Sequence, residues 1–148
     1  MPSKQQIQSD MIAAMKAKED TKTNALRMLK AAILKFEVSG DRKEATEDDI
    51  ANIIVKEIKQ RQDSAEQFKT GGRAEMAAKE EAEIVVLKEY LPPQMSEEEV
   101  TALVKEVIQQ VGATSKADMG KVMGALMPKV KGKADGGMVN KIVGSLLG

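Results

Sequence analysis

The sequence predicts an all-α protein, with an N-terminal four-helix unit followed by a small C-terminal three-helix bundle. Three observations lead to this fold class. Aromatic residues make up only 2% of the 148 residues, whereas strands are rich in aromatic and β-branched side chains. Apolar residues recur at helical spacing, without a sustained alternating pattern. Capping residues and glycines punctuate these stretches at intervals typical of helices.

Four helices are expected before the Pro92-Pro93 pair. Ser3 is a candidate N-cap for the first helix, and Thr46 with Asp49 resembles a capping box for the third. Glycines after the second and third helices are expected to end them. The predicted helices cover about residues 4–18, 21–38, 47–69 and 73–90.

The Pro92-Pro93 pair is the best candidate for a domain boundary, because proline cannot continue a helix. We therefore expect an N-terminal helical domain at residues 1–92 and a C-terminal three-helix domain at residues 93–148. Ser96 with Glu99 forms a capping box pattern, and Ser115 and Asp135 are candidate starts for the next two helices. The expected ranges are about 97–111, 115–129 and 136–147.

The composition excludes several classes of function. The chain has no cysteine and no histidine, so it lacks disulfides, Cys/His metal sites and the Ser-His-Asp and Cys-His catalytic arrangements. Its few aromatic residues argue against proteins that stack bases on aromatic side chains. No metal or cofactor is expected. No apolar run reaches the roughly 20 residues of a membrane span, and the N-terminus lacks the apolar core of a signal peptide, so a cytoplasmic location is expected.

The formal net charge is zero, with 23 basic and 23 acidic residues, but residues 113–148 carry six lysines against two aspartates. Gly120 and Gly124 lie on one face of a predicted helix, where each glycine costs about 1 kcal/mol relative to alanine. Either a neighbouring helix or the backbone of a partner could require that space. The segment from Gly132 to Gly137 is interpreted as a C-cap followed by an N-cap, or alternatively as an anion site.

A second basic surface is a candidate in the N-terminal part. A solvated helix face explains these residues, and contact with phosphates is the alternative. Glu80 and Glu83 could form a carboxylate pair, without the further ligands that a metal would need. The basic residues are Arg27, Lys30, Lys56, Lys59, Arg61 and Arg73.

Four strings, spread over nearly the whole chain, resemble YqeY-type proteins of the GatB/YqeY group: residues 26–30 (LRMLK), 59–64 (KQRQDS), 89–94 (EYLPPQ) and 119–136 (MGKVMGALMPKVKGKADG). The resemblance implies a two-part all-α architecture. It also implies similarity to the C-terminal tail of the B subunit of the glutamine-dependent Asp/Glu-tRNA amidotransferase, a tail that touches tRNA. The group carries the label of carbon–nitrogen ligase with glutamine as amido-N-donor.

The residues do not support a ligase site. No cysteine nucleophile, adjacent serine pair or Walker-type glycine loop occurs. We therefore expect a non-catalytic RNA-binding accessory module, with tRNA or a tRNA-linked protein complex as partner. The sequence does not indicate whether the chain forms oligomers. A protein–protein adaptor and the amidotransferase chemistry itself are the alternatives. The candidate RNA-binding residues are Lys121, Lys129, Lys131, Lys133 and Lys141, with Gly120, Gly124, Gly132 and Gly136.

Overall fold

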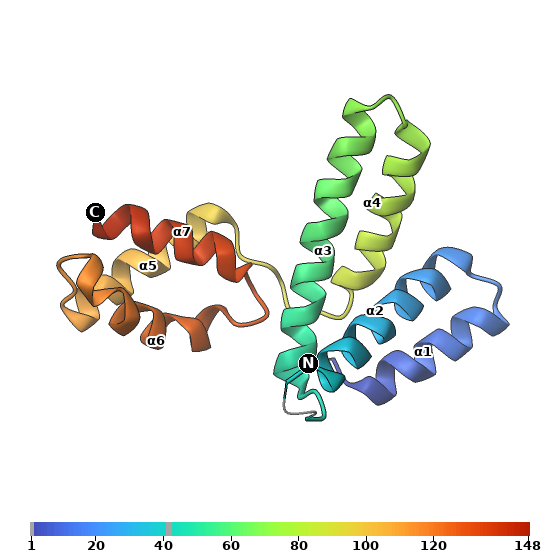
Figure 1. Cartoon of the computed structure of the whole chain (residues 1–148), viewed down its shortest axis with the longest axis horizontal. Helices are drawn as coiled ribbons and strands as arrows, with labels where there is room; N and C mark the ends of the chain where they lie inside the picture. Colours follow the sequence, from blue (N-terminus) through green and yellow to red (C-terminus); the bar gives the residue numbers. More distant parts are fainter. Residues whose placement is uncertain (1, 41–42) are drawn as a thin grey trace. The chain divides into compact units, whose positions relative to one another are not determined.

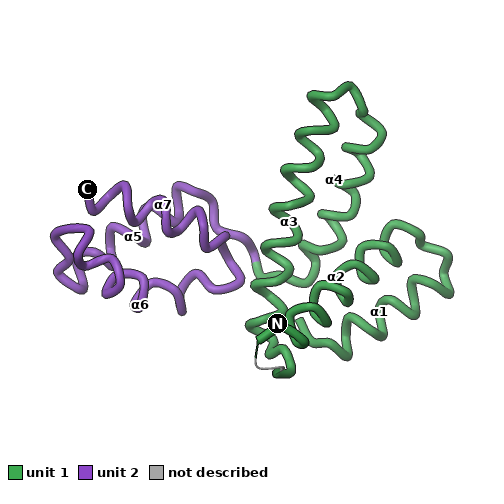
Figure 2. The backbone as a smooth tube through the Cα atoms, in the orientation of Figure 1, with its two compact units in different colours: residues 1–92 green, residues 93–148 purple. Residues whose placement is uncertain are grey.

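The computed structural model describes residues 2–40 and 43–148. Within these residues the secondary structure is helical and contains no strand, which confirms the all-α prediction. The chain divides into two compact units, residues 1–92 and residues 93–148 (Figure 2). The elements are α1 (Lys4–Lys16), α2 (Asp20–Val38), α3 (Glu47–Thr70), α4 (Ala74–Lys88), α5 (Glu97–Val111), the 3-10 turn η1 (Lys116–Asp118), α6 (Met119–Val130) and α7 (Gly136–Leu147) (Figure 1).

The first unit consists of two helical pairs, α1 with α2 and α3 with α4 (Figure 1). Contacts of α2 with both α3 and α4 join the two pairs. Because every helix contributes aliphatic residues to the same cluster, burial of apolar surface stabilises the arrangement of the pairs. The core includes Ile7, Leu26, Leu29, Ile33, Ile50, Ile54, Ile58, Ile84 and Leu87.

The second unit is a three-helix bundle in which α5 contacts α6 and α7, and α6 also contacts α7. Its core contains no aromatic side chain among the buried residues, as the composition predicts. The row of methionines at positions 119, 123 and 127 packs against this core as half-buried side chains. The buried residues are Val100, Val104, Val107, Val122, Leu126, Val130, Val139, Ile142, Val143 and Leu147.

The predicted helix starts at Ser3, Thr46 and Ser96 are confirmed. Each of these side chains accepts a hydrogen bond, 3.1 Å long, from the backbone N–H three residues later. In turn, the Asp49 and Glu99 carboxylates accept hydrogen bonds from the backbone N–H groups of Thr46 and Ser96, which completes the two capping boxes. Local sequence therefore determines where these three helices begin.

The start of α6 differs from the prediction. Ser115 makes no side-chain cap bond and precedes η1, and α6 begins at Met119. The Asp118 carboxylate accepts from the backbone N–H of Thr114 at 2.9 Å. This bond pairs the N–H of Thr114 within the loop, and the regular helix begins only after Asp118.

Candidate nucleic-acid interface

The loop between α6 and α7, residues 131–135, is held in place by the segment that precedes α5. The Gln94 Nε2 donates to the carbonyl of Gly132 at 2.8 Å. The backbone N–H of Met95 donates to the carbonyl of Lys133, also at 2.8 Å. Gly132 is buried and has a φ of 74°, a left-handed conformation that glycine adopts without strain. The lysines at positions 131 and 133 therefore extend from an ordered backbone.

Three of the five candidate lysines are close in sequence on this loop and the end of α6. Lys129, Lys131 and Lys133 are all exposed. We call these three residues the lysine loop. Lys121 is also exposed, but it precedes Lys129 by eight residues, which corresponds to about 12 Å along the axis of α6. Lys141 lies on the exposed side of α7, opposite the buried residues of that helix.

The two aspartates near the lysines are engaged with the backbone. Asp135 accepts from the N–H of Met138 at 3.2 Å and so caps α7. Asp118 accepts from Thr114, and this hydrogen bond is the largest cause that lowers the pKa of the Asp118 carboxyl. Both carboxylates have a structural role at a helix start.

The exposed face of α6 carries two glycines that no neighbour requires. A Cβ added at Gly120 or Gly124 would meet nothing within 4 Å, and both residues are exposed. Close packing of a neighbouring helix, the first interpretation of these glycines, is therefore wrong. Pro128 lies inside the helix and has no N–H to donate to the carbonyl of Gly124. On this face the backbone at Gly120 and Gly124 is therefore uncovered, and the carbonyl of Gly124 has no N–H donor four residues later in the helix.

The chain itself uses several of the backbone donors of the anion site considered between Gly132 and Gly137. The N–H groups of Lys133 and Ala134 donate to the carbonyl of Val130, at 2.8 and 3.1 Å. Asp135 takes the N–H of Met138. Because the chain itself uses these three donors, an anion here would depend on lysine side chains and on the N–H groups of Gly136 and Gly137 at the start of α7.

The second basic surface is divided by the structure. Arg27, Lys56, Lys59 and Arg73 are exposed, and Lys30 is half-buried. Arg61, in contrast, has 5% of its surface exposed. Its Nη1 donates to the carboxylates of Glu80, at 3.2 Å, and of Glu83. The prediction of Arg61 as a phosphate contact is therefore wrong.

The structure assigns the carboxylates of Glu80 and Glu83 to Arg61. Glu83 has 4% of its surface exposed, so a charge there requires a partner. The sequence contains a signal for this arrangement, since Arg61 continues the apolar row of α3 formed by Ile54, Ile58 and Ala65. An arginine in such a row indicates burial with an acidic partner on the facing helix.

Comparison with known proteins supports the resemblance found in the sequence. A family model described as "Yqey-like protein" matches residues 4–147. A relative from Pyrenophora tritici-repentis, "Altered inheritance of mitochondria protein 41, mitochondrial", is 32% identical over 96% of this chain and 79% of its own length. Proteins with the same name from Lachancea thermotolerans and Saccharomyces cerevisiae are 32% and 29% identical, over 71% and 81% of this chain and 57% and 68% of their own lengths.

These findings also correct one expectation. The relatives are named as mitochondrial proteins, which contradicts the expectation of a cytoplasmic location. That expectation rested on the absence of a membrane span and of an apolar signal-peptide core, and neither absence identifies a compartment by itself. Among residues 2–40 and 43–148, no helix is both long and apolar enough to cross a bilayer.

Proposed function

This chain belongs to the Yqey-like protein family, and we propose that it is a non-catalytic accessory module that binds RNA, with tRNA as the preferred class. The observation that carries this proposal is the exposed glycine face of α6, together with the lysine loop at the end of the same helix. A glycine face with open space on it suits a ligand whose backbone approaches closely. Lysines beside it suit a ligand that carries negative charge.

The lysine loop would contact phosphates. Such contacts contribute affinity and orientation without reading sequence. Lys129, Lys131 and Lys133 are exposed on a segment anchored by Gln94 and Met95. Because the backbone of this segment is ordered before binding, fewer degrees of freedom are lost when the lysines meet a phosphate.

The glycine face would contact sugar and base edges. At Gly120 and Gly124 no side chain covers the helix backbone. The Gly124 carbonyl, which Pro128 leaves without its helical donor, can accept from a ribose 2′-hydroxyl. A 2′-hydroxyl is the group by which proteins distinguish RNA from DNA, so this face favours RNA over DNA.

Binding of the full chain to total tRNA across a range of salt concentrations tests the proposal. Wild-type affinity is expected to fall linearly with salt on a log–log plot, and the slope of that plot counts the neutralised phosphates. The Lys129→Ala/Lys131→Ala/Lys133→Ala variant should bind more weakly, with a slope smaller by about 2. Absence of binding by the wild type at low salt would refute the proposal.

A matched variant controls for overall charge. The Lys16→Ala/Lys79→Ala/Lys88→Ala variant removes the same charge from three exposed positions outside the lysine loop. It should keep the wild-type slope. If both triple variants lose the same affinity, binding depends on net charge and the lysine loop is not an interface.

A ligase function is tested separately. Amidation needs activation of a carboxylate and ammonia from glutamine, and the sequence shows no nucleophile pair or nucleotide loop for either. The purified chain is expected to show no ATP-dependent release of ammonia from glutamine in the presence of misacylated tRNA. Turnover above that of a heat-denatured sample would contradict the non-catalytic assignment.

A further inference from the structure

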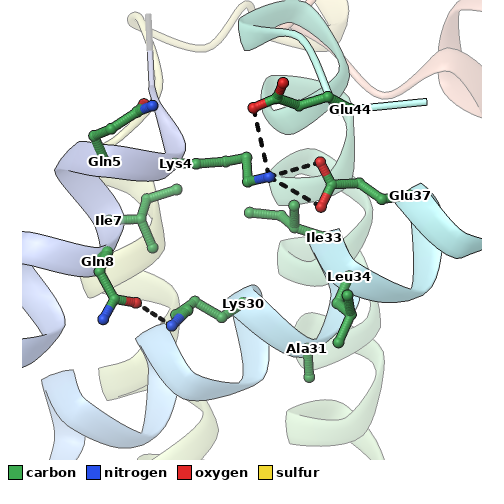
Figure 3. A pocket seen from close by; sticks show the side chains of 10 residues that line it. All are labelled: Lys4, Gln5, Ile7, Gln8, Lys30, Ala31, Ile33, Leu34, Glu37 and Glu44. Atoms are coloured by element: carbon green, nitrogen blue, oxygen red, sulfur yellow. Dashed lines mark hydrogen bonds and ion pairs between the residues drawn. The ribbon is translucent and has the colours of Figure 1, made fainter. Parts of the chain in front are cut away.

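A groove lies between α1 and α2 in the first unit, whereas the proposed RNA interface belongs to the second unit. Figure 3 shows its lining side chains. Ile7 and Ile33 come from the core side of the two helices, and Ala31 and Leu34 line it from α2. The groove has a volume of about 570 Å³, which is in the range of binding pockets. Among the apolar residues that line the groove, Leu34 has 60% of its surface exposed.

The apolar lining continues along the exposed face of α2. Ala31, Leu34 and Val38 follow one another at a spacing of three and four residues, which places them on one side of the helix. Val38 has 58% of its surface exposed. Adjacent apolar side chains with this much exposure commonly mark an interaction site. We call the exposed residues Ala31, Leu34 and Val38, which lie above the buried Ile7 and Ile33, the α2 docking surface.

The charges beside the N-terminal part of this surface are basic. Between Thr21 and Phe36, α2 carries Lys22, Arg27, Lys30 and Lys35 and no acidic residue. The Lys30 ammonium donates to the neutral side-chain amide oxygen of Gln8. Within the described residues, neither Arg27 nor Lys30 takes part in an ion pair.

The two acidic residues that line the groove lie at one end of it and form ion pairs with Lys4. Lys4 pairs with Glu37 at 2.8 Å and with Glu44 at 3.7 Å (Figure 3). Glu37 also accepts from the backbone N–H of Ala45 at 2.8 Å. The hydrogen bond between Lys4 and Glu37 raises the pKa of Lys4 and lowers that of Glu37. Lys4 offsets only one of these two carboxylates, so this end of the groove keeps one negative charge. The positive charge available to a partner lies two turns or more earlier on α2, at Lys30 and Arg27.

We propose that the α2 docking surface binds an acidic amphipathic helix of a partner protein. An apolar side chain of that helix enters the groove and packs on Leu34 and Ala31, above the buried Ile7 and Ile33. Its carboxylates, one turn away, meet Lys30 and Arg27. A helix with leucines and glutamates at a spacing of three and four residues presents both groups on adjacent faces.

Two other ligands fit this surface less well. RNA would satisfy Arg27 and Lys30, but its phosphates would leave Leu34 and Val38 without apolar contacts. A lipid surface would bury apolar residues, but it is flat on the scale of one helix, whereas the apolar lining here is recessed between α1 and α2. A convex apolar side chain flanked by carboxylates satisfies the groove and the charges together.

The probe is a labelled peptide of about 20 residues, long enough to form an isolated helix. It consists of glutamate and alanine, with leucines at helical spacing along one face. Titration of the full chain, followed by two-dimensional 15N NMR, should shift the amides of Gln8, Lys30, Ala31 and Leu34. Leu34→Ser should weaken peptide binding about tenfold, because it removes most of one buried leucine contact.

Matched controls separate the two contributions. Val85→Ser changes an apolar residue on α4 that is equally exposed, at 62%, and should leave binding unchanged. Lys30→Gln should weaken binding and reduce its salt dependence, whereas Lys88→Gln should not. A peptide with lysine in place of every glutamate should not bind. Because Leu34 and Val85 are both exposed, both serine variants should fold.

Several results would overturn the proposal. These are absence of amide shifts at millimolar peptide, or peptide binding that is unaffected by both Leu34→Ser and Lys30→Gln. Loss of tRNA binding or of anionic vesicle binding in Leu34→Ser, with peptide binding unchanged, would assign the surface to nucleic acid or lipid. Loss of self-association in Leu34→Ser would assign it to a second copy. The lysine loop variants should leave peptide binding intact, so this proposal and the RNA proposal can fail independently.

Discussion

Arg61 of α3 and Glu83 of α4 form an ion pair inside the first unit, with 5% and 4% of their surfaces exposed. The carboxylate of Glu80, which is half-buried, lies 3.2 Å from the same guanidinium nitrogen, Nη1 of Arg61. Arg61 Nη2 also approaches the sulfur of Met28 on α2 at 3.3 Å. One arginine thus joins three of the four helices of this unit.

Removal of the Arg61 side chain should strongly destabilise the first unit. Arg61→Ala leaves Glu83 buried without a counter-charge, and loss of one partner of a buried pair costs about 3–5 kcal/mol. Denaturant unfolding followed by circular dichroism measures the effect. Arg73→Ala is the control, because Arg73 is exposed, and it should change stability by less than about 0.5 kcal/mol. Equal effects of the two substitutions would contradict a role for burial.

Glu57 gives a prediction about pH. Burial raises the pKa of its carboxyl, against the opposing charges of Arg61 and Lys35. A folded-state pKa above the unfolded value means that the folded chain binds the proton more tightly, so the charged carboxylate costs stability as pH rises through the folded pKa. Glu57→Gln should therefore raise Tm at pH 7.

The benefit of Glu57→Gln should disappear at low pH. Below the ordinary pKa of 4.5, the wild-type carboxyl is protonated in both states and resembles glutamine in charge. Thermal melts at pH 7 and pH 3.5 test this, with Glu66→Gln as the control, because Glu66 is exposed on the same helix. A gain in Tm that is the same at both pH values would show that charge burial is not its cause.

Gly124 should separate stability from binding. Gly124→Ala places a Cβ in open space, and alanine is favoured over glycine inside a helix by up to about 1 kcal/mol. The variant should therefore be more stable than the wild type. It should also bind tRNA more weakly, because the methyl group covers the backbone at the proposed interface.

The comparison substitution is Gly144→Ala, in α7. An added Cβ there would meet the Cε of Met119 at 3.9 Å, an ordinary contact, so a similar gain in stability is expected. Its tRNA binding should be unchanged. If Gly124→Ala stabilises the chain and leaves tRNA affinity intact, the glycine face of α6 is not in contact with RNA.

Ser96→Ala should weaken the second unit through its first helix. The side chain of Ser96 accepts from the N–H of Glu99 in a complete capping box, and loss of such a cap costs about 1 kcal/mol. Ser115→Ala removes a serine that makes no cap bond, so unfolding by urea should hardly change. A larger loss in Ser115→Ala would contradict the assignment of the caps.

Local sequence predicted the helices because their boundaries depend on residues within one turn. Ser3, Thr46 and Ser96 form their caps with N–H groups three residues away, and α7 begins after Asp135 as predicted. The apolar rows were only partly predictive. Met28 and Met76 belong to such rows but have 53% and 43% of their surfaces exposed, since a helix is covered only where another helix packs on it.

The candidate sites depended more on tertiary structure. The sequence identified the lysines and glycines of α6, but only the arrangement of the second unit showed that the space beside Gly120 and Gly124 is open. Arg61 was assigned to a surface because its partners Glu80 and Glu83 are 19 and 22 positions away. The apolar row around Arg61 indicates that it is buried, but it does not identify which acidic residues of the facing helix are its partners.

The sequence by itself determined the fold class, the helix boundaries at strong caps and the resemblance to a family. These properties follow from backbone hydrogen bonding and side-chain periodicity within a few residues. Tertiary structure alone decided which residues are covered. The hydrogen bond between Tyr90 and Asp10 joins residues 80 positions apart, and the groove between Ile7 and Leu34 requires α1 and α2 to be packed. Burial and charge pairing depend on neighbours in space, which local patterns do not specify.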